Sequence, residues 1–110
     1  FGLDADYPNG RISVHPSLRH SGRVCCQLGM HGFDMAVEVG GGFRRLSIET
    51  TYSGSADFRV LVEDSATTCK ATRGVGEALP CKIGKLGEGT YVTFESRVDV
   101  GVNSFELICR

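Results

Sequence analysis

The chain has 110 residues, the length of one domain, and its 12 basic and 13 acidic side chains leave a formal net charge of −1. This balance excludes a general attraction to nucleic acid or to membrane surfaces, and no apolar run approaches the ~20 residues of a membrane-spanning helix. Five cysteines and 15 glycines predict a small, turn-rich domain that is secreted and extracellular, because oxidising compartments favour a high density of cysteine.

The first residues predict an irregular segment that leads into the sheet. Residues 1–10 show no periodicity, and Pro-Asn-Gly at residues 8–10 is typical of a turn. Ile12 and Val14 alternate with polar neighbours, so a short strand is expected to begin there.

The next segment is ambiguous between helix and strand. Pro16 suits the first turn of a helix, and apolar or small residues then recur at helical spacing at Leu18, Gly22, Cys25, Leu28 and Gly29. We therefore predict a helix over residues 16–28, ended by the last of these glycines. The alternation of Val24, Cys26 and Leu28 leaves a strand over residues 23–28 as the alternative.

From residue 33 onward, the pattern is that of strands in an antiparallel sheet. Apolar and polar residues alternate, most clearly over residues 90–100, where Val92 and Phe94 share one face. Residues 65–88 contain Pro80 and several glycines and predict mostly loop. The expected strands are residues 33–39, 43–50, 57–63, 90–100 and 103–109.

One helix followed by strands predicts an α+β fold for a single domain over residues 1–110. In this fold the helix packs on one face of a twisted antiparallel sheet. A strand in place of the helix would give an all-β sandwich, which is the alternative fold class. The structure of residues 16–28 is the observation that separates the two.

The five cysteines cannot all pair within one chain. Cys69 and Cys81 flank the glycine-rich loop and are the natural local pair. Cys25 and Cys26 are adjacent, and neighbouring residues seldom satisfy disulfide geometry, so Cys109 is expected to pair with one of them. The leftover thiol is expected to be buried in a monomer, with a covalent dimer through it as the alternative.

The histidines of the chain are His15, His20 and His31. With Cys25 or Cys26 they are the candidates for a metal site, but their spacing matches no ligand pattern, so neither a metal nor another cofactor is expected. The Gly-x-Ser-x-Gly elbow of many hydrolases is missing from the sequence, and a serine hydrolase is not predicted.

Three arginines are candidates for binding an anion. Arg44 and Arg45 follow a glycine-rich turn, and Arg59 lies on the next expected strand. A guanidinium fork suits phosphate or carboxylate, and with His31 these arginines form the predicted binding set. The alternative is that they are solvated charges that discourage pairing between strand edges of different molecules.

Several short segments, taken in order, carry a resemblance. They are residues 6–10 with Ile12-Ser13, residues 32–35, residues 52–57 with Arg59-Val60, and residues 103–105 with Cys109. This set resembles the fungal guanyl-specific ribonucleases. Residues 62–65 and 89–91 also resemble the ribonuclease-like secreted effectors of plant-pathogenic fungi. The resemblance implies a ribonuclease-like fold, secretion and, for an effector, entry into host cells.

The groups that such a ribonuclease needs for catalysis are missing. The resemblance places a base Glu where this chain reads Phe43-Arg44-Arg45, and an acid His on a late strand, whereas no His follows His31. Arg59 alone matches, and Asn9 replaces a Cys of the family. The resemblance therefore implies a catalytically inactive effector that binds a host protein or RNA weakly, and not an enzyme.

Other functions stay open from the sequence. The main alternative is an unrelated small secreted β-sandwich that acts as a toxin or binding module. A self-assembling structural protein linked through an unpaired cysteine is another. The last is a ribonuclease that uses His15, His20 or His31 in an unfamiliar arrangement.

Overall fold

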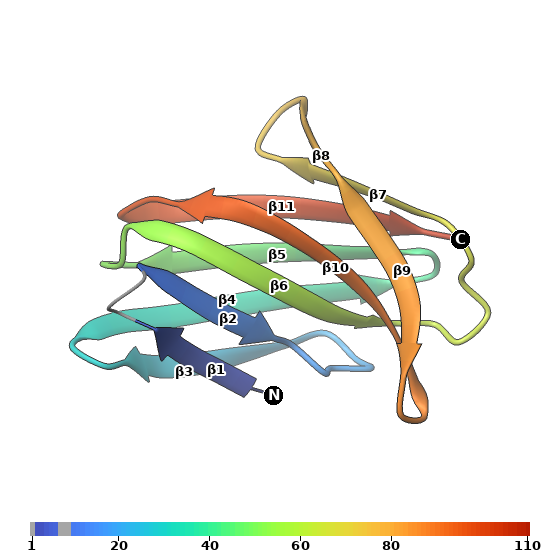
Figure 1. Ribbon diagram of the computed structural model, residues 1–110, viewed down its shortest axis with the longest axis horizontal. Helices are drawn as coiled ribbons and strands as arrows, with labels where there is room; N and C mark the ends of the chain where they lie inside the picture. Colours follow the sequence, from blue (N-terminus) through green and yellow to red (C-terminus); the bar gives the residue numbers. More distant parts are fainter. Residues whose placement is uncertain (1, 7–9) are drawn as a thin grey trace.

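The computed structural model describes residues 2–6 and 10–110, and the side chains of residues 10–25 and 27–110. Within this part the chain forms eleven strands and no helix (Figure 1). In chain order the strands are β1 (Gly2–Asp6), β2 (Arg11–His15), β3 (Gly22–Leu28), β4 (His31–Gly40), β5 (Phe43–Thr50), β6 (Gly54–Val62), β7 (Cys69–Arg73), β8 (Glu77–Leu79), β9 (Cys81–Leu86), β10 (Gly89–Val98) and β11 (Gly101–Cys109). The described residues thus include no helix of the length and apolarity that crossing a membrane requires.

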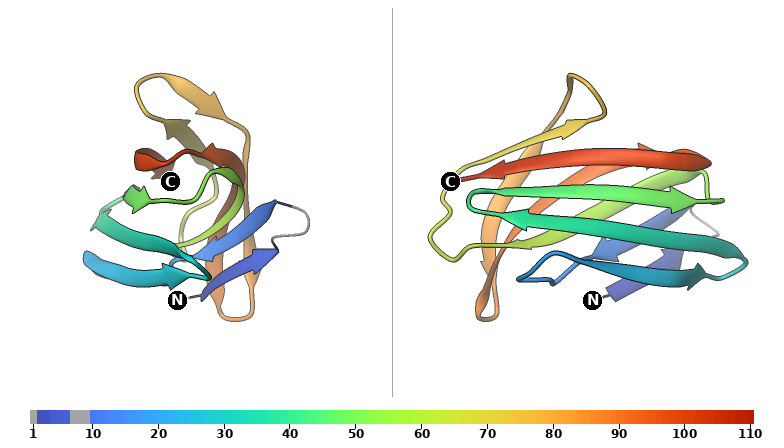
Figure 2. Two further views of the ribbon diagram at one scale, coloured as in Figure 1. Left: turned by 90° about the vertical axis from the view of Figure 1, so that its left-hand side faces the viewer. Right: turned by 180° about the vertical axis from the view of Figure 1, so that it is seen from behind.

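The strands form two sheets that pack face to face as a β-sandwich (Figures 1 and 2). The five-stranded sheet has the order β1-β2-β6-β10-β9, and the six-stranded sheet has the order β3-β4-β5-β11-β7-β8. The pairings are antiparallel except that of β2 with β6, which run parallel. The longest strands follow the long axis of a molecule that measures 38 × 30 × 25 Å.

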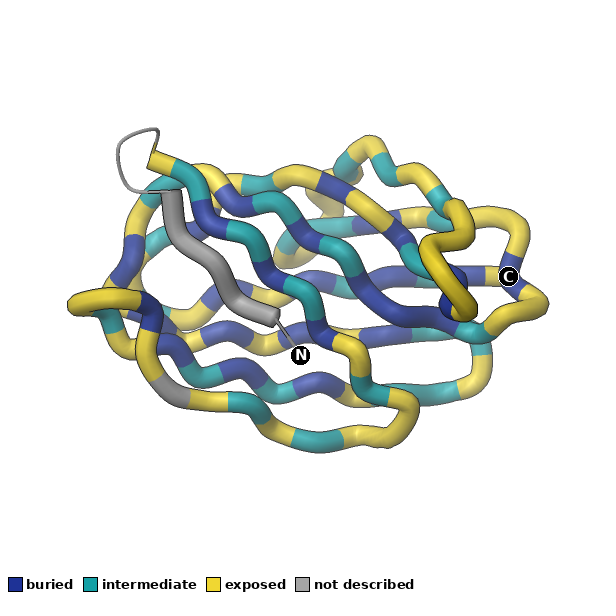
Figure 3. Tube along the Cα trace, turned by 60° about the horizontal axis from the view of Figure 1, so that its bottom comes forward, coloured by how far each residue is buried: buried dark blue, intermediate teal, exposed yellow. Residues whose placement is uncertain are grey.

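The hydrophobic core lies between the sheets, because side chains along the long strands alternate between buried and exposed (Figure 3). Leu46 and Ile48 of β5 are buried in this way. Phe58 and Phe94 of the five-stranded sheet stack with ring centroids 4.7 Å apart, and Phe105 of the other sheet packs 4.9 Å from Phe58. Aromatic rings bury much apolar area, so this cluster is a main contact between the sheets.

The predicted helix over residues 16–28 is wrong, and with it the α+β class. Residues 22–28 are β3, which pairs with β4 along its whole length, and the turn Gly29-Met30 joins the two strands. Gly29 has a φ of +62°, so the glycine expected to end a helix makes a hairpin turn instead. Pro16, expected in the first turn of the helix, comes directly after β2, and its carbonyl accepts a hydrogen bond from the amide of Leu61. The fold is the all-β sandwich that the sequence left as its alternative.

The five strands predicted from alternation are confirmed as β4, β5, β6, β10 and β11. Two segments expected to be irregular also contain strands. Residues 2–6 form β1, and residues 65–88 contain β7, β8 and β9. Three of the glycines that predicted a loop, Gly74, Gly76 and Gly87, occupy turns between strands with positive φ, while Gly84 lies within β9. The turn predicted at residues 8–10 lies largely outside the described residues.

The β7–β8 hairpin projects from the sandwich, and the chain then crosses from one sheet to the other (Figures 1 and 2). β7 and β8 extend the six-stranded sheet beyond β11, whereas β9 is an edge strand of the five-stranded sheet. Residues 69–81 therefore link the two sheets at one edge of the molecule.

Candidate functional site: a hollow on the five-stranded sheet

Arg44 is buried between the sheets, where the fold itself occupies its guanidinium. The residue is 3% exposed, and it donates hydrogen bonds of 2.8–3.1 Å to the carbonyls of Gly40, Phe43 and Leu61. It also pairs with Glu63 at 3.3 Å. Burial opposes ionisation of Glu63, but the charge and hydrogen bond of Arg44 outweigh it and lower the pKa of Glu63. This position gives Arg44 a structural role in place of the predicted contact with a ligand.

Arg45 lies on the opposite side of β5, because successive side chains of a strand point to opposite faces. On the exposed face of the six-stranded sheet it bonds Glu106 at 2.9 Å and Glu38 at 3.0 Å, and its guanidinium lies 4.7 Å from the centre of the Phe43 ring. The hydrogen bonds to Glu106 and then Glu38 raise the pKa of Arg45. Arg59 faces out from the other sheet, so the structure does not bring the three predicted arginines together.

The predicted histidines do not gather either. His31 starts β4, where its Nδ1 atom lies 3.1 Å from the hydroxyl of Thr51 and its ring packs edge-on against Tyr52. His15 ends β2, and His20 follows in the connection to β3. Within the part of the chain that the structure describes, no three His, Cys, Asp or Glu side chains are placed to hold a metal ion.

A hollow of about 600 Å³ opens on the outer face of the five-stranded sheet. Strands β2, β6, β9 and β10 all contribute to its lining. The polar side chains that line it are His15, Asp57, Arg59, Lys82, Thr93 and Glu95. We define this set as the outer hollow.

The register of the strands arranges these side chains in two adjoining rows. Arg59 of β6 lies opposite Thr93 of β10, which lies opposite Lys82 of β9, and this is the cationic row. Asp57 of β6 lies opposite Glu95 of β10, two residues along each strand, and this is the acidic row. Cross-strand neighbours on one face lie within about 5.5 Å at Cα, so both rows face the same small volume.

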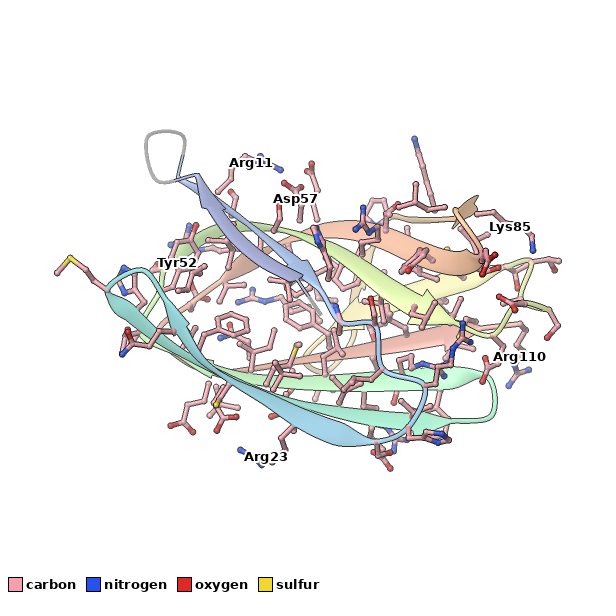
Figure 4. All side chains as sticks on the ribbon, turned by 90° about the horizontal axis from the view of Figure 1, so that it is seen from below. Arg11, Arg23, Tyr52, Asp57, Lys85 and Arg110 are labelled. Atoms are coloured by element: carbon pink, nitrogen blue, oxygen red, sulfur yellow. The ribbon has the colours of Figure 1, made fainter. Side chains whose placement is uncertain are left out.

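Arg11 of β2 holds the acidic row in place. Its guanidinium bonds both oxygens of Asp57, at 2.6 and 3.1 Å, and Glu95 at 2.9 Å. Arg11 and Asp57 point out from the sheet toward one another, on the side of the molecule opposite Arg23 (Figure 4). The hydrogen bonds from Arg11 outweigh partial burial and hold the pKa of Asp57 below its usual value. Asp57 is therefore ionised at neutral pH.

Arg59 has a different environment from Arg11. Its Nη2 atom lies 3.5 Å from Nδ1 of His15, and its guanidinium lies 5.5 Å from the centre of the Tyr91 ring. Among the described residues, no carboxylate forms an ion pair with Arg59, and its buried Nε atom has no hydrogen-bond partner. Buried donors without acceptors are rare in folded proteins, so this atom marks a place where an acceptor is missing.

A second hollow, of about 650 Å³, lies on the outer face of the six-stranded sheet. Its floor contains the small side chains of Ala36, Ser47 and Ser104, which the register places side by side on β4, β5 and β11. Its charged side chains are already paired with one another or with close neighbours: Arg23 with Asp34, and Arg45 with Glu38 and Glu106. We define it as the paired hollow.

Most residues of the outer hollow were not predicted as a site. The predicted strand over residues 90–100, with Val92 and Phe94 on one face, implies that Thr93 and Glu95 lie on the other, but no local signal paired them with β6. Lys82 lay in a segment expected to be loop, and His15 was considered as a metal ligand or as a catalytic residue, not as part of a binding surface. Of the residues that line the outer hollow, only Arg59 was predicted to bind an anion.

The cysteines also differ from expectation. Cys25 is disulfide-bonded, Cys69, Cys81 and Cys109 carry free thiols, and the side chain of Cys26 lies outside the described part. Cys109 does not bond Cys25, because β4 and β5 separate their strands by about 14 Å, while a disulfide needs Cα atoms within about 7 Å. Cys69 and Cys81, predicted to bond to each other, carry free thiols on β7 and β9, two strands that are in contact.

Comparison with known proteins gives a likeness of fold. No family model and no curated protein sequence matches the chain. Part of a solved GH127 β-L-arabinofuranosidase from Geobacillus stearothermophilus T6 is similar, with a TM-score of 0.62 and 15% sequence identity. The similarity covers 92% of this chain but 15% of that chain, so this domain corresponds to a small part of the enzyme.

This likeness is to an all-β domain, and it overturns the resemblance to guanyl-specific ribonucleases and fungal ribonuclease-like effectors. That resemblance required a helix on a sheet, where the described chain has two packed sheets. The short matched segments are mostly turns and strand starts, such as residues 32–35 and 52–57, and these are common to many β-proteins. The function of an inactive ribonuclease-like effector is therefore wrong as well.

Proposed function

We propose that this domain is a secreted, non-catalytic binding module, and that the outer hollow binds glycans with carboxylate groups, such as uronic acids. The observation that carries the proposal is the state of Arg59. Its guanidinium lines an open hollow, has no carboxylate partner among the described residues, and keeps a buried Nε atom without an acceptor. A carboxylate from a ligand would give the guanidinium the ionic partner that it lacks among these residues.

The chemistry of the cationic row favours a carboxylate. A guanidinium presents parallel N–H groups in a planar fork that matches the two oxygens of a carboxylate. Tyr91 supports this fork from one side, and the exposed ammonium of Lys82 lies two strands away in the same row. Both cations thus lie on the surface that the ligand would cover.

The acidic row favours a sugar over other carboxylates. Asp57 and Glu95 offer oxygens that accept hydrogen bonds, and a sugar ring carries several hydroxyl donors. A uronic acid combines these hydroxyls with one carboxylate, so it matches both rows at once. The solved protein of similar fold is a β-L-arabinofuranosidase by its name, which supports a sugar ligand for this kind of domain.

RNA fits the outer hollow less well. Binding to RNA needs several phosphates to be neutralised by Lys and Arg, whereas the carboxylates of Asp57 and Glu95 stand beside Arg59 and repel a phosphate chain. The net charge of −1 adds no compensating attraction. Host RNA is thus an outcome to be tested against the glycan.

The state of Asp57 also supports a role without catalysis. Hydrolysis of a glycosidic bond uses a carboxylic acid that donates a proton and is paired with a second carboxylate. Arg11 lowers the pKa of Asp57 and bonds Glu95 as well, so this pair is arranged as two acceptors. An Asp57 side chain held ionised in this way accepts hydrogen bonds from hydroxyl groups and does not supply a proton.

The test is calorimetric titration of the intact domain with three ligands: a trigalacturonate, a neutral galactose trisaccharide of the same length, and single-stranded oligouridylate. We expect binding of the trigalacturonate alone. Arg59→Ala should weaken it roughly 10- to 100-fold, because a hydrogen bond to a charged group contributes about 1.5–3 kcal/mol. Arg45→Ala is the matched control, since it removes an arginine from the other face, and it should leave the affinity unchanged.

Three results would overturn the proposal. Equal affinity for the neutral trisaccharide would remove the role of the carboxylate. Preference for oligouridylate would replace the glycan with RNA. Unchanged affinity in Arg59→Ala would remove the outer hollow from the binding surface.

A further inference from the structure

Cys69 and Cys81 stand at the base of the projecting β7–β8 hairpin. Cys69 is the first residue of β7 in the six-stranded sheet, and Cys81 is the first residue of β9 in the five-stranded sheet. Between them the chain runs out along β7 and β8 and returns to the opposite sheet (Figures 1 and 2). The two side chains are half-buried against the core where β7 contacts β9, and interaction with the Cys81 thiol helps to raise the pKa of Cys69.

We propose that Cys69 and Cys81 are a modification site, at which a small-molecule disulfide oxidises the two thiols to a disulfide that links the two sheets. The proposal rests on this contact and on the two topological positions, and it does not depend on what the outer hollow binds. Two thiols that interact in this way need only a small adjustment to reach the S–S bond length of about 2.05 Å.

The order of the reaction follows from access. Cys81 begins β9, an edge strand of its sheet, whereas Cys69 begins β7, which has a neighbouring strand on each side, so the sulfur of Cys81 is the first to meet a disulfide from solvent. Its thiolate attacks one sulfur of the reagent, forms a mixed disulfide and releases the first thiolate. The sulfur of Cys69 then loses its proton, attacks the sulfur of Cys81 and releases the second thiolate. The two protons from the cysteines pass to the two released thiolates, and the reagent is the oxidant.

Cys69 is suited to the second step and not to the first. Burial, then contact with Cys81 and the proximity of Cys109, raise the pKa of the Cys69 thiol to about 12. A thiol that is almost entirely protonated reacts slowly with a reagent in solution. Inside a mixed disulfide, its attack is intramolecular and benefits from a high effective concentration.

Cys109 is the neighbouring thiol that the proposal leaves reduced. It lies opposite Cys69 across the β11–β7 pair, is 1% exposed, and donates a hydrogen bond of 3.9 Å to Glu63. Burial raises the pKa of Cys109, although the charge of Arg44 opposes this effect. A Cys69–Cys109 bond would join strands that are already paired, whereas a Cys69–Cys81 bond would join two sheets.

The experiment treats the intact domain with oxidised glutathione and counts thiols after unfolding without reductant. We expect the count to fall from the three thiols of Cys69, Cys81 and Cys109 to one, the mass to fall by about 2 Da, and a mapped cross-link between residues 69 and 81. The melting temperature should rise by roughly 10 °C, because the bond closes a short loop.

Two variants make the test specific. Cys109→Ser should still lose two thiols and gain the same cross-link, and Cys81→Ser should not gain it. After protease cleavage within residues 70–80, the two fragments should stay joined only in oxidised protein. A cross-link that contains Cys109, or a stable adduct of glutathione on Cys81 without closure, would overturn the proposal.

Discussion

The two outer faces of the sandwich carry hollows of similar volume, about 600 Å³ on the five-stranded sheet and about 650 Å³ on the six-stranded sheet. Both are lined by arginine and carboxylate side chains. They differ in how the arginines are used. Arg45 in the paired hollow has carboxylates on both sides, whereas Arg59 in the outer hollow has none among the described residues.

This difference indicates that a surface arginine is available to a ligand when it has no ion pair within the protein. The presence of charge alone does not mark a binding surface. The hydrogen bonds of Arg45 to Glu38 and Glu106 would have to break before it could hold a ligand, and that loss would offset much of the gain. Arg59 has no ion pair with a described residue that would have to break, only its contact with His15 at 3.5 Å. The acidic row of the outer hollow is also pre-arranged by Arg11, so a ligand meets acceptors that are already oriented.

The largest effect on stability is expected at Arg44, whose guanidinium is buried and has hydrogen-bond and ion-pair partners. Arg44→Ala removes the donors to three carbonyls and leaves the Glu63 carboxylate without its partner. We expect a loss of about 3–5 kcal/mol in the free energy of unfolding, measured by urea denaturation. Arg45→Ala, one residue along the same strand, is the control and should lose only a small fraction of this. Similar losses in both variants would show that Arg44 does not organise the interior.

How much of this fold the sequence could predict depended on the length of the strands. Long alternating segments such as residues 90–100 identified β10 and its neighbours, because a period of two that continues over many residues fits a half-buried strand and does not fit a helix. Residues 22–28 are short and their apolar positions fit both periods, so the choice between helix and strand depended on pairing with β4, a contact that local pattern does not contain.

The candidate site shows the same limit. Arg44 and Arg45 were placed on one surface, although the period of a strand already puts adjacent residues on opposite faces. The neighbours of Arg59 were beyond reach, since Thr93 and Lys82 come beside it only through the order β6-β10-β9. An arginine gains or lacks a carboxylate partner only when the sheets assemble, so no sequence motif marks Arg59.

A smaller effect is expected at the Arg11–Asp57 pair, and it should depend on pH. The pKa of Asp57 is lower in the folded protein than its usual value of 3.8. Its pair with Arg11 therefore adds stability above pH 4, and this contribution is lost as the pH falls through the lowered pKa. In Arg11→Ala the free energy of unfolding should be reduced at pH 6, and the difference from the unmodified protein should vanish near pH 2.

Urea denaturation at each pH measures this difference. Arg23→Ala is the control, because it removes one exposed ion-paired arginine from the other face of the molecule. A constant difference for Arg11→Ala from pH 6 to pH 2 would mean that the acidic row is not held by this pair. Trigalacturonate affinity should also fall in Arg11→Ala, because two unpaired carboxylates repel the acidic ligand.

The smallest effect on stability is expected at the residue with the largest effect on binding. Arg59→Met keeps most of the side-chain volume over Tyr91 and removes a guanidinium whose Nε atom is buried without an acceptor. The lost contact with the ring and the relieved desolvation of that atom oppose each other. The free energy of unfolding should thus change by less than about 0.5 kcal/mol in either direction.

The control variant, Arg45→Met, should lower the free energy of unfolding by more, because it breaks two ion pairs. Urea denaturation and trigalacturonate titration of both variants would then give opposite rankings, with Arg59 first for affinity and Arg45 first for stability. If Arg59→Met proves the more destabilising, Arg59 supports the fold as Arg44 does, and the contrast between the two faces fails.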